Sequence, residues 1–158
     1  MEELYIKYYK KLYLYAFSLC KDYHLAQDLT SDTFFKAYLS LKDDCPVKYW
    51  LFRVCKNLYF DYLRHNKEYS TDIILKEIST IIDTTLDKII KSEDRKYLYN
   101  LILELNEPNK EILILYYFCG FSLKEISQMK NITEGVAKTK LFRARMKLKK
   151  ELEGKYEL

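Results

Sequence analysis

Glycine and proline are scarce in this sequence of 158 residues, with three glycines and two prolines. Because both residues interrupt helices, their scarcity favours an all-helical fold. The sequence also lacks an apolar run long enough to span a bilayer, and the longest runs, such as residues 112–121, are too short. Glu2 and Glu3 stand where a signal peptide would have a basic region. We therefore expect a soluble protein in the cytoplasm.

Groups that carry catalysis or bind metals are scarce as well. The two histidines, His24 and His65, have no candidate catalytic partner near them in the sequence. There is no glycine-rich phosphate loop, and no nucleophile stands beside a base. The four cysteines lack metal-ligand spacing, and Cys20 and Cys55 fall within helical apolar patterns, which predicts reduced core thiols. These absences predict a protein that is not an enzyme, with no metal, no cofactor and no small-molecule substrate.

What the sequence does contain is a series of amphipathic helices. Hydrophobic residues make up 49% of the chain. Apolar side chains at helical spacing predict helices over residues 2–21, 25–41 and 46–67, and further helices beginning near Ser92 and Asn109. Residues 68–94 are different, because seven acids against three lysines give this segment a local charge of −4. We therefore predict two small helical domains, residues 1–67 and 92–158, joined by an acidic linker at 68–91.

The stretch from Ser122 to Leu152 predicts two helices with a tight turn between them. Ser122 and Glu125, three residues apart, match a capping box. Asn131 suits the left-handed stop of a short helix, and Thr133 suits the cap of the next. The second helix has an apolar stripe formed by Ala137, Leu141, Ala144, Leu148 and Leu152. The charged tail after this stripe is expected to fray.

The other face of this second helix is basic. From residue 137 to residue 150 there are seven Lys or Arg residues and no acid. At roughly 100° per residue, the side chains turned away from the stripe are Lys138, Thr139, Phe142 and Arg143. Basic side chains bind phosphates, and Arg, Lys and Thr also bind base edges in the major groove. A solvated surface helix is the alternative, but the capped helix and the turn before it favour a DNA-binding helix-turn-helix.

The first half of the chain carries two weaker signals. Asp28 and Asp32 lie four residues apart on one helical face, where they are either surface acids or a docking face for a basic partner. Residues 48–67 interleave basic and aromatic side chains. That pattern suits binding of single-stranded nucleic acid and equally suits a tyrosine-rich core helix.

Three stretches together resemble a known family. They are AQDLTSDTFFKAY at 26–38, WLFRVCKNLYFDYLRHNK at 50–67 and EISQMKNITEGVAKTKLFRAR at 125–145. In this order and spacing they resemble the alternative sigma factors of bacterial RNA polymerase, of the extracytoplasmic-function (ECF) type. The resemblance covers nearly the whole chain and implies that residues 1–67 are region 2 and residues 92–158 are region 4.

The resemblance implies roles for both domains. Region 2 would bind the clamp helices of the largest polymerase subunit through Asp28, Leu29, Asp32 and Phe35. The same domain would recognise and melt the −10 promoter element, with a loop at 41–47 that holds a flipped-out base. Its matching positions for −10 binding are Leu41, Lys42, Lys56, Asn57, Asp61 and Arg64.

Region 4 would bind the −35 element and contact the polymerase flap. Its base-reading positions match Lys138, Thr139, Phe142 and Arg143, and we expect Lys140, Arg145 and Lys147 to meet phosphates. The implied partners are core RNA polymerase, promoter DNA and an anti-sigma factor. Several positions depart from the family pattern. Leu105-Asn106-Glu107-Pro108 stands where Leu-Pro-Glu is usual, Lys130 replaces a usual apolar residue, and Asn131 replaces a usual glycine. Val136 and Ala137 stand where Thr-Val is common, and Leu41 stands where an aromatic is common.

Three other functions are weighed against this one. A helix-turn-helix regulator that binds duplex DNA alone would use the first domain for dimerisation or for an effector. A structural or adaptor protein would bind no DNA, and a nuclease would require a metal site. The Asp28/Asp32 face and the helix from Trp50 to Arg64 favour the sigma factor over the stand-alone regulator.

Overall fold

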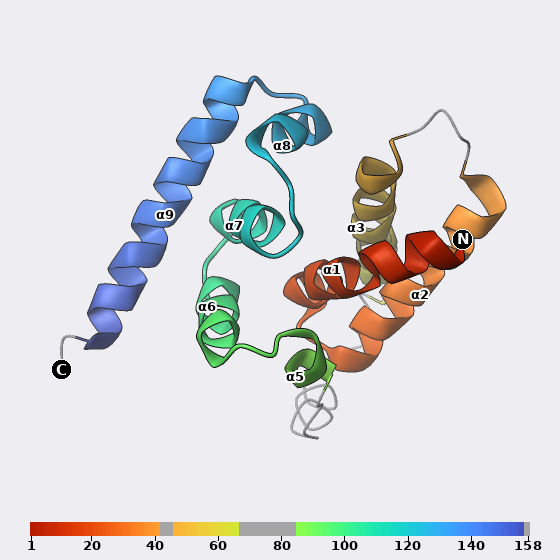
Figure 1. Cartoon of the computed structure of the whole chain (residues 1–158), viewed down its shortest axis with the longest axis horizontal. Helices are drawn as coiled ribbons and strands as arrows, with labels where there is room; N and C mark the ends of the chain where they lie inside the picture. The colour runs from red at the N-terminus through yellow and green to blue at the C-terminus, as the bar shows by residue number, and fades with distance from the viewer. Residues whose placement is uncertain (42–45, 67–84, 157–158) are drawn as a thin grey trace. The chain divides into compact units, whose positions relative to one another are not determined.

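Helices account for all the regular structure in the residues that the structure describes, which are 1–41, 46–66 and 85–156 (Figure 1). In this computed structural model the chain divides into two units, Met1–Ile89 and Ile90–Leu158. The prediction of an all-α fold with two helical domains is therefore confirmed. The predicted linker at 68–91 falls mostly outside the described residues, and its last part carries the short helix α5 (Thr85–Ile89).

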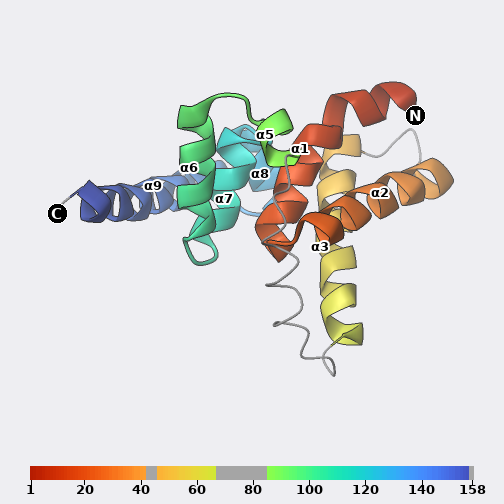
Figure 2. The same ribbon diagram turned by 90° about the horizontal axis from the view of Figure 1, so that it is seen from below.

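The first unit is built on three helices that pack against one another: α1 (Glu2–Cys20), α2 (Tyr23–Ser40) and α3 (Val47–His65). Figure 2 shows α3 crossing α2 steeply. The core includes fully buried Leu12, Tyr15, Leu51 and Phe52, and the ring centroids of Tyr15 and Phe52 lie 5.2 Å apart. Burial of such side chains stabilises the unit by about 1.5–3 kcal/mol each.

A tight connection joins α1 to α2. Lys21 takes the left-handed conformation with φ 54°, which ends α1. Asp22 then caps α2, because its side chain accepts a hydrogen bond of 3.0 Å from the backbone N–H of Leu25. This cap fixes the start of the helix that carries the Asp28/Asp32 face.

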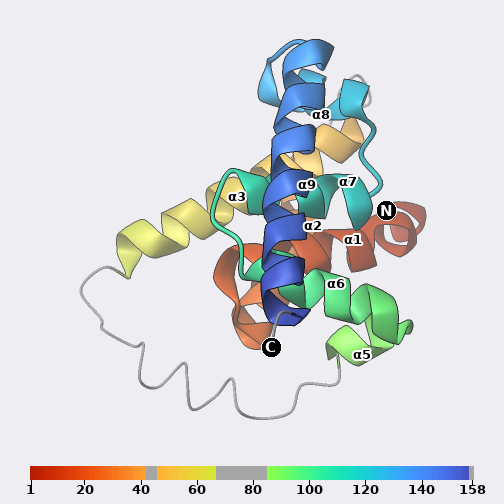
Figure 3. The same cartoon turned by 90° about the vertical axis from the view of Figure 1, so that its left-hand side faces the viewer.

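The second unit contains α6 (Glu93–Leu103), α7 (Asn109–Tyr117), α8 (Leu123–Lys130) and α9 (Glu134–Tyr156). Figure 3 shows α9 running across α7. The helix α7 is buried from Glu111 to Leu115, and α6, α8 and α9 all pack against it. It is therefore the platform on which α8 and α9, the two helices of the predicted helix-turn-helix, are mounted.

The predicted helix ends of this motif are confirmed. The Ser122 hydroxyl accepts from the Glu125 N–H at 3.1 Å, and the Glu125 carboxylate accepts from the Ser122 N–H at 3.0 Å. Asn131 ends α8 with φ 56°, and the Thr133 hydroxyl accepts from the Val136 N–H at 3.1 Å. The helix α9 extends past Leu152 to Tyr156, and the expected fraying of this charged tail stays a prediction.

The described cysteines Cys20, Cys55 and Cys119 are free thiols, and Cys45 lies outside the described residues. Cys55 is fully buried among α1, α2 and α3. Burial raises the pKa of the Cys55 thiol to about 12, so almost none of it is thiolate near neutral pH.

We therefore expect Cys55 to resist alkylation by iodoacetamide at pH 8 in the folded chain and to react readily in urea, because the thiolate is the nucleophile. Half-buried Cys20 should react first. Mass spectrometry of the alkylated peptides measures both rates. Equal rates for the two cysteines in the folded chain would contradict the packing of α3.

Candidate nucleic-acid and partner-binding surfaces

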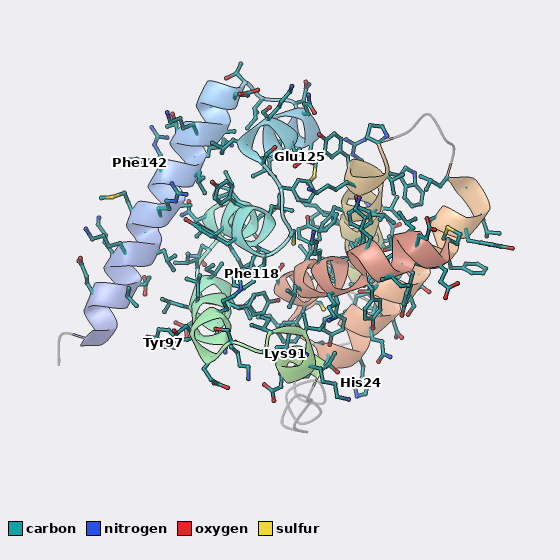
Figure 4. The ribbon with its side chains drawn as sticks, in the orientation of Figure 1. His24, Lys91, Tyr97, Phe118, Glu125 and Phe142 are labelled. Carbon is teal, nitrogen blue, oxygen red and sulfur yellow. The ribbon has the colours of Figure 1, made fainter. Side chains whose placement is uncertain are left out.

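The face of α9 turned away from α7 carries the predicted DNA-binding residues. The apolar stripe is buried at Ala137 (0% exposed), Leu141 (2%) and Ala144 (0%). Phe142 is 62% exposed and points away from α7 (Figure 4). The remaining exposed residues of the predicted set are Lys138, Thr139, Lys140, Arg143, Arg145 and Lys147. The structure thus presents a basic surface with one exposed aromatic ring at its centre.

Two apolar residues on this face were missed by the sequence analysis. Val136 is 43% exposed and Met146 is 45% exposed. They share helical spacing with Thr139 and Arg143, which is the signal that could have identified them. An exposed apolar side chain beside basic ones suits contact with a thymine methyl group in the major groove.

Arg145 belongs to the predicted set, but it is engaged within the unit. Its Nε–H donates a hydrogen bond of 2.7 Å to the Tyr117 hydroxyl of α7. This hydrogen bond raises the pKa of Arg145 above its usual value. Its guanidinium carbon lies 5.4 Å from the ring centroid of Tyr116 and 5.6 Å from that of Tyr117. Arg145 is thus held against α7, although it was predicted to meet a phosphate.

Lys130, which departs from the family pattern, has a partner that the sequence did not reveal. Its ammonium forms an ion pair with the Glu111 carboxylate in the first turn of α7. The Glu111 side chain is only 5% exposed and that of Lys130 is 26% exposed. A lysine is therefore compatible with this position because a buried carboxylate lies opposite it.

On α2 the structure separates the predicted partner-binding residues. Asp28, Asp32 and Phe35 are exposed, and Phe35 is 64% exposed, whereas Leu29 is 4% exposed and packs into the core. The apolar spacing of residues 25–41 makes Tyr38 a candidate for the inward face of this helix, and that prediction is wrong, because Tyr38 is 70% exposed. The inward positions of α2 are filled by smaller or neighbouring side chains, among them Ala26, Thr33, Phe34 and Ala37.

The exposed residues of α2, including Leu39, which is 64% exposed, form a surface that we call the α2 face. Its members are Asp28, Asp32, Phe35, Tyr38 and Leu39. Two carboxylates at one end and three apolar side chains at the other suit a partner with both basic and apolar groups.

On α3 the predicted −10 residues are partly brought together. Asn57 and Arg64 are exposed, Lys56 and Asp61 are half-buried, and Asp61 forms an ion pair with Arg64. The Lys56 ammonium lies 5.9 Å from the ring centroid of Phe60, which is 44% exposed. Leu41 is half-buried at the end of α2. Lys42, with most of the predicted 41–47 loop, lies outside the described residues.

Arg53 and Phe60 complete this surface and were not singled out by the sequence analysis. Arg53, Asn57, Phe60 and Arg64 are all exposed and recur at helical spacing along one face of α3, which we call the α3 face. Cationic groups beside an exposed ring suit stacked bases and their phosphates. The half-buried tyrosines of this helix show that the core interpretation of its aromatics is also partly correct.

Neither a metal site nor a membrane span is found within the described ranges. No cluster of three His, Cys, Asp or Glu side chains there is arranged to hold a metal ion. No helix there has the length and apolar character that crossing a membrane requires.

Comparison with known proteins accounts for both units. The family model for Sigma-70 region 2 matches residues 4–69, and that for Sigma-70, region 4 matches residues 95–148. The ECF RNA polymerase sigma factor SigM of Bacillus subtilis is 36% identical over 154 residues, covering 94% of this chain and 93% of its own. SigW of the same organism, also an ECF sigma factor, is 28% identical over 158 residues, covering 92% and 84%.

Solved structures agree on the fold. The sigma factor RpoE from Bartonella quintana, solved with the anti-sigma factor NepR, has a TM-score of 0.67, 22% identity and 96% coverage of both chains. CnrH, solved with the cytosolic domain of CnrY, has a TM-score of 0.65, 19% identity and coverage of 97% of this chain and 87% of its own. Two sigma regions in one chain disfavour a stand-alone regulator. This chain belongs to the ECF sigma factors of RNA polymerase, which are transcription initiation factors and not enzymes.

Proposed function

We propose that residues 1–67 act as region 2 and bind core RNA polymerase through the α2 face. The support is the exposure of two carboxylates, Asp28 and Asp32, beside the large apolar side chains of Phe35, Tyr38 and Leu39. Apolar side chains of this size are rarely left uncovered as a group unless a partner covers them. Leu29, which is 4% exposed, is proposed to support this face from within the core.

The α3 face is proposed to hold the melted −10 element. Phe60 offers a ring on which an unpaired base stacks, and Lys56, Arg53 and Arg64 offer cations for the phosphates. Asn57 offers amide groups that hydrogen-bond to a base edge. Leu41 and Lys42 are proposed to flank the base that leaves the stack, with Asp61 orienting Arg64 through their ion pair.

Residues 92–158 are proposed to act as region 4 and bind the −35 element through α9. The observation that carries this proposal is the division of α9 into a buried apolar stripe and an exposed basic face with Phe142 at its centre. The stripe holds the helix on α7, so the opposite face is free to enter the major groove. Lys138, Thr139, Phe142 and Arg143 are the proposed base contacts, and Lys140 and Lys147 are proposed to meet phosphates.

We expect Arg143→Ala to weaken promoter binding by the polymerase holoenzyme by about 1.5 kcal/mol, roughly 10-fold, because a lost base contact costs about 1–3 kcal/mol. The loss should be seen only on promoters that have the base pair that Arg143 contacts in the −35 element. Promoters substituted at that base pair should bind the variant and the wild type equally. Filter binding on promoters substituted at each −35 position measures this, with Lys147→Ala as the matched control. Equal losses on every promoter would make Arg143 a phosphate contact instead.

Membership of the ECF sigma factors suggests where the protein acts and what regulates it. We propose that it functions in the cytoplasm, where RNA polymerase is found, and that an anti-sigma factor holds it inactive. The relative RpoE was solved in complex with an anti-sigma factor, NepR, which supports a partner of this class. Affinity capture of the tagged full-length chain from its own cells, followed by mass spectrometry, should recover core polymerase subunits and this partner. Recovery of neither would contradict the proposal.

A further inference from the structure

The C-terminal half of α9 has few apolar anchors. Burial along its stripe falls from Ala144, which is fully buried, to half-buried Leu148 and to Leu152, which is 36% exposed. Two of the three fully packed stripe residues are alanines, each with a single methyl group to contact the neighbouring helices. Such small side chains allow close approach but resist rotation or sliding of the helix weakly. A directed contact between α9 and α7 would therefore add to this packing in fixing the rotation of α9.

A cluster of polar and aromatic contacts lies at the point where the stripe ends. The Arg145 Nε–H donates to the Tyr117 hydroxyl at 2.7 Å, and its guanidinium lies near the rings of Tyr116 and Tyr117. The two rings meet edge to face, with centroids 5.1 Å apart. A planar guanidinium held by one directed hydrogen bond and two ring faces has little orientational freedom.

The opposite side of Tyr117 is fixed to α6. The Arg95 side chain donates a hydrogen bond of 2.9 Å to the Tyr117 carbonyl, which lies at the end of α7. The guanidinium carbon of Arg95 also lies 4.7 Å from the ring centroid of Phe118, which packs between α6 and α7 (Figure 4). Tyr117 thus links α6 to α9, and we call Arg95, Tyr117 and Arg145 the arginine clasp.

The clasp is well placed to control base recognition. Arg143 is two residues before Arg145, so it lies roughly 160° around the helix from it. When Arg145 is held against α7, Arg143 therefore points away from the unit. A rotation of α9 by one-tenth of a turn would displace the tip of an arginine by several ångströms, more than a hydrogen bond to a base edge tolerates.

We propose that Arg145 and Tyr117 are positioning residues that set the rotation of α9 on α7 and so determine which base edges Arg143 and its neighbours meet. The inference rests on the proposed role of α9 in −35 binding. It assigns to Arg145 a function other than the phosphate contact that its charge suggests. Arg95 extends the same function by holding the backbone of Tyr117.

The test is selection of promoter DNA by holoenzyme assembled from core polymerase and the full-length chain. The probe is a duplex library randomised in its −35 and −10 regions. Tyr117→Phe removes one hydroxyl, and Arg145→Ala removes the guanidinium. Both variants should select a −35 sequence that is relaxed at the positions that wild type specifies, with affinity for the wild-type sequence about 5–10-fold lower. The −10 sequence that they select should stay the same.

Three further arms separate positioning from other roles. The Tyr117→Phe/Arg145→Ala double variant should be no worse than Arg145→Ala alone, because both changes break one contact. Arg145→Lys keeps the charge and should not rescue −35 selection. Lys140→Ala is the control for loss of a phosphate contact. It should lower affinity on all sequences and make the slope of the log binding constant against log salt concentration smaller by about 0.9. The clasp variants should keep the wild-type slope.

Distinct results would overturn the inference and the function on which it rests. If Tyr117→Phe selects DNA like wild type and Arg145→Ala only lowers affinity with a smaller salt slope, Arg145 is a phosphate contact. A uniform loss on all sequences with an unchanged slope would indicate partial unfolding and would also overturn the inference. If wild type selects no −35 sequence, or if Arg143→Ala leaves the selected sequence unchanged, then the proposed role of α9 itself is wrong.

Discussion

Replacing Lys130 by methionine is expected to destabilise the second unit by about 3 kcal/mol. Lys130 pairs with the Glu111 carboxylate, whose side chain is 5% exposed. Loss of one partner of a buried ion pair removes the opposite charge that stabilises the other, which costs about 3–5 kcal/mol. The lower end applies because the Lys130 side chain is 26% exposed and water reaches the site from that side.

The same reasoning predicts recovery in a double variant. The Glu111→Leu/Lys130→Met variant removes both charges. Its free energy of unfolding should be within about 1 kcal/mol of that of wild type. Lys149→Met is the matched control, because it removes an exposed lysine of α9 and should change stability by less than about 0.5 kcal/mol.

Urea unfolding followed by circular dichroism measures these differences. Fluorescence of the single tryptophan, Trp50 in α3, reports on the first unit alone and separates its transition from that of the second. A single variant as stable as wild type would mean that the ion pair makes no net contribution. A double variant as unstable as Lys130→Met would mean that the lysine acts through packing and not through charge.

Replacing Phe35 by alanine is expected to weaken binding to core polymerase by about 2 kcal/mol, roughly 30-fold. Phe35 is 64% exposed and lies on the α2 face with Tyr38 and Leu39. Large aromatic side chains near the centre of an interface carry much of its binding energy. Because Phe35 is exposed in the free chain, the variant should keep the stability of wild type.

Phe60→Ala is the matched control for this experiment. Phe60 is also an exposed aromatic of the first unit, but it lies on the α3 face that is proposed to meet DNA. It should leave polymerase binding unchanged and reduce promoter opening, which permanganate footprinting detects. Fluorescence titration of labelled chain with core polymerase measures the affinity. Equal losses for Phe35→Ala and Phe60→Ala would contradict the separation of the two faces.

Features set by neighbouring residues were predictable from the sequence. The capping box at Ser122 and Glu125 and the left-handed Asn131 involve groups within a few positions, so local chemistry determines them. The basic face of α9 followed from helical spacing in the same way. The resemblance to sigma factors supplied the family, which the comparisons confirm.

Contacts between distant residues were not predictable from one sequence. Lys130 and Glu111 are 19 positions apart, and Arg145 and Tyr117 are 28 apart, so only the packing of α8 and α9 on α7 brings them together. Tyr38 was misplaced for a related reason. The apolar residues of α2 fit more than one stripe, and packing against α1 and α3 decides which stripe is buried.

The central claim, that this chain directs initiation through separate polymerase-binding and DNA-binding surfaces, is tested most directly by run-off transcription. Purified core polymerase is incubated with genomic promoter fragments, with and without the chain. We expect discrete start sites that require the chain and that disappear with the Asp28→Ala/Asp32→Ala variant. Tight binding of a duplex site by the chain alone, without any polymerase-dependent start site, would contradict the claim.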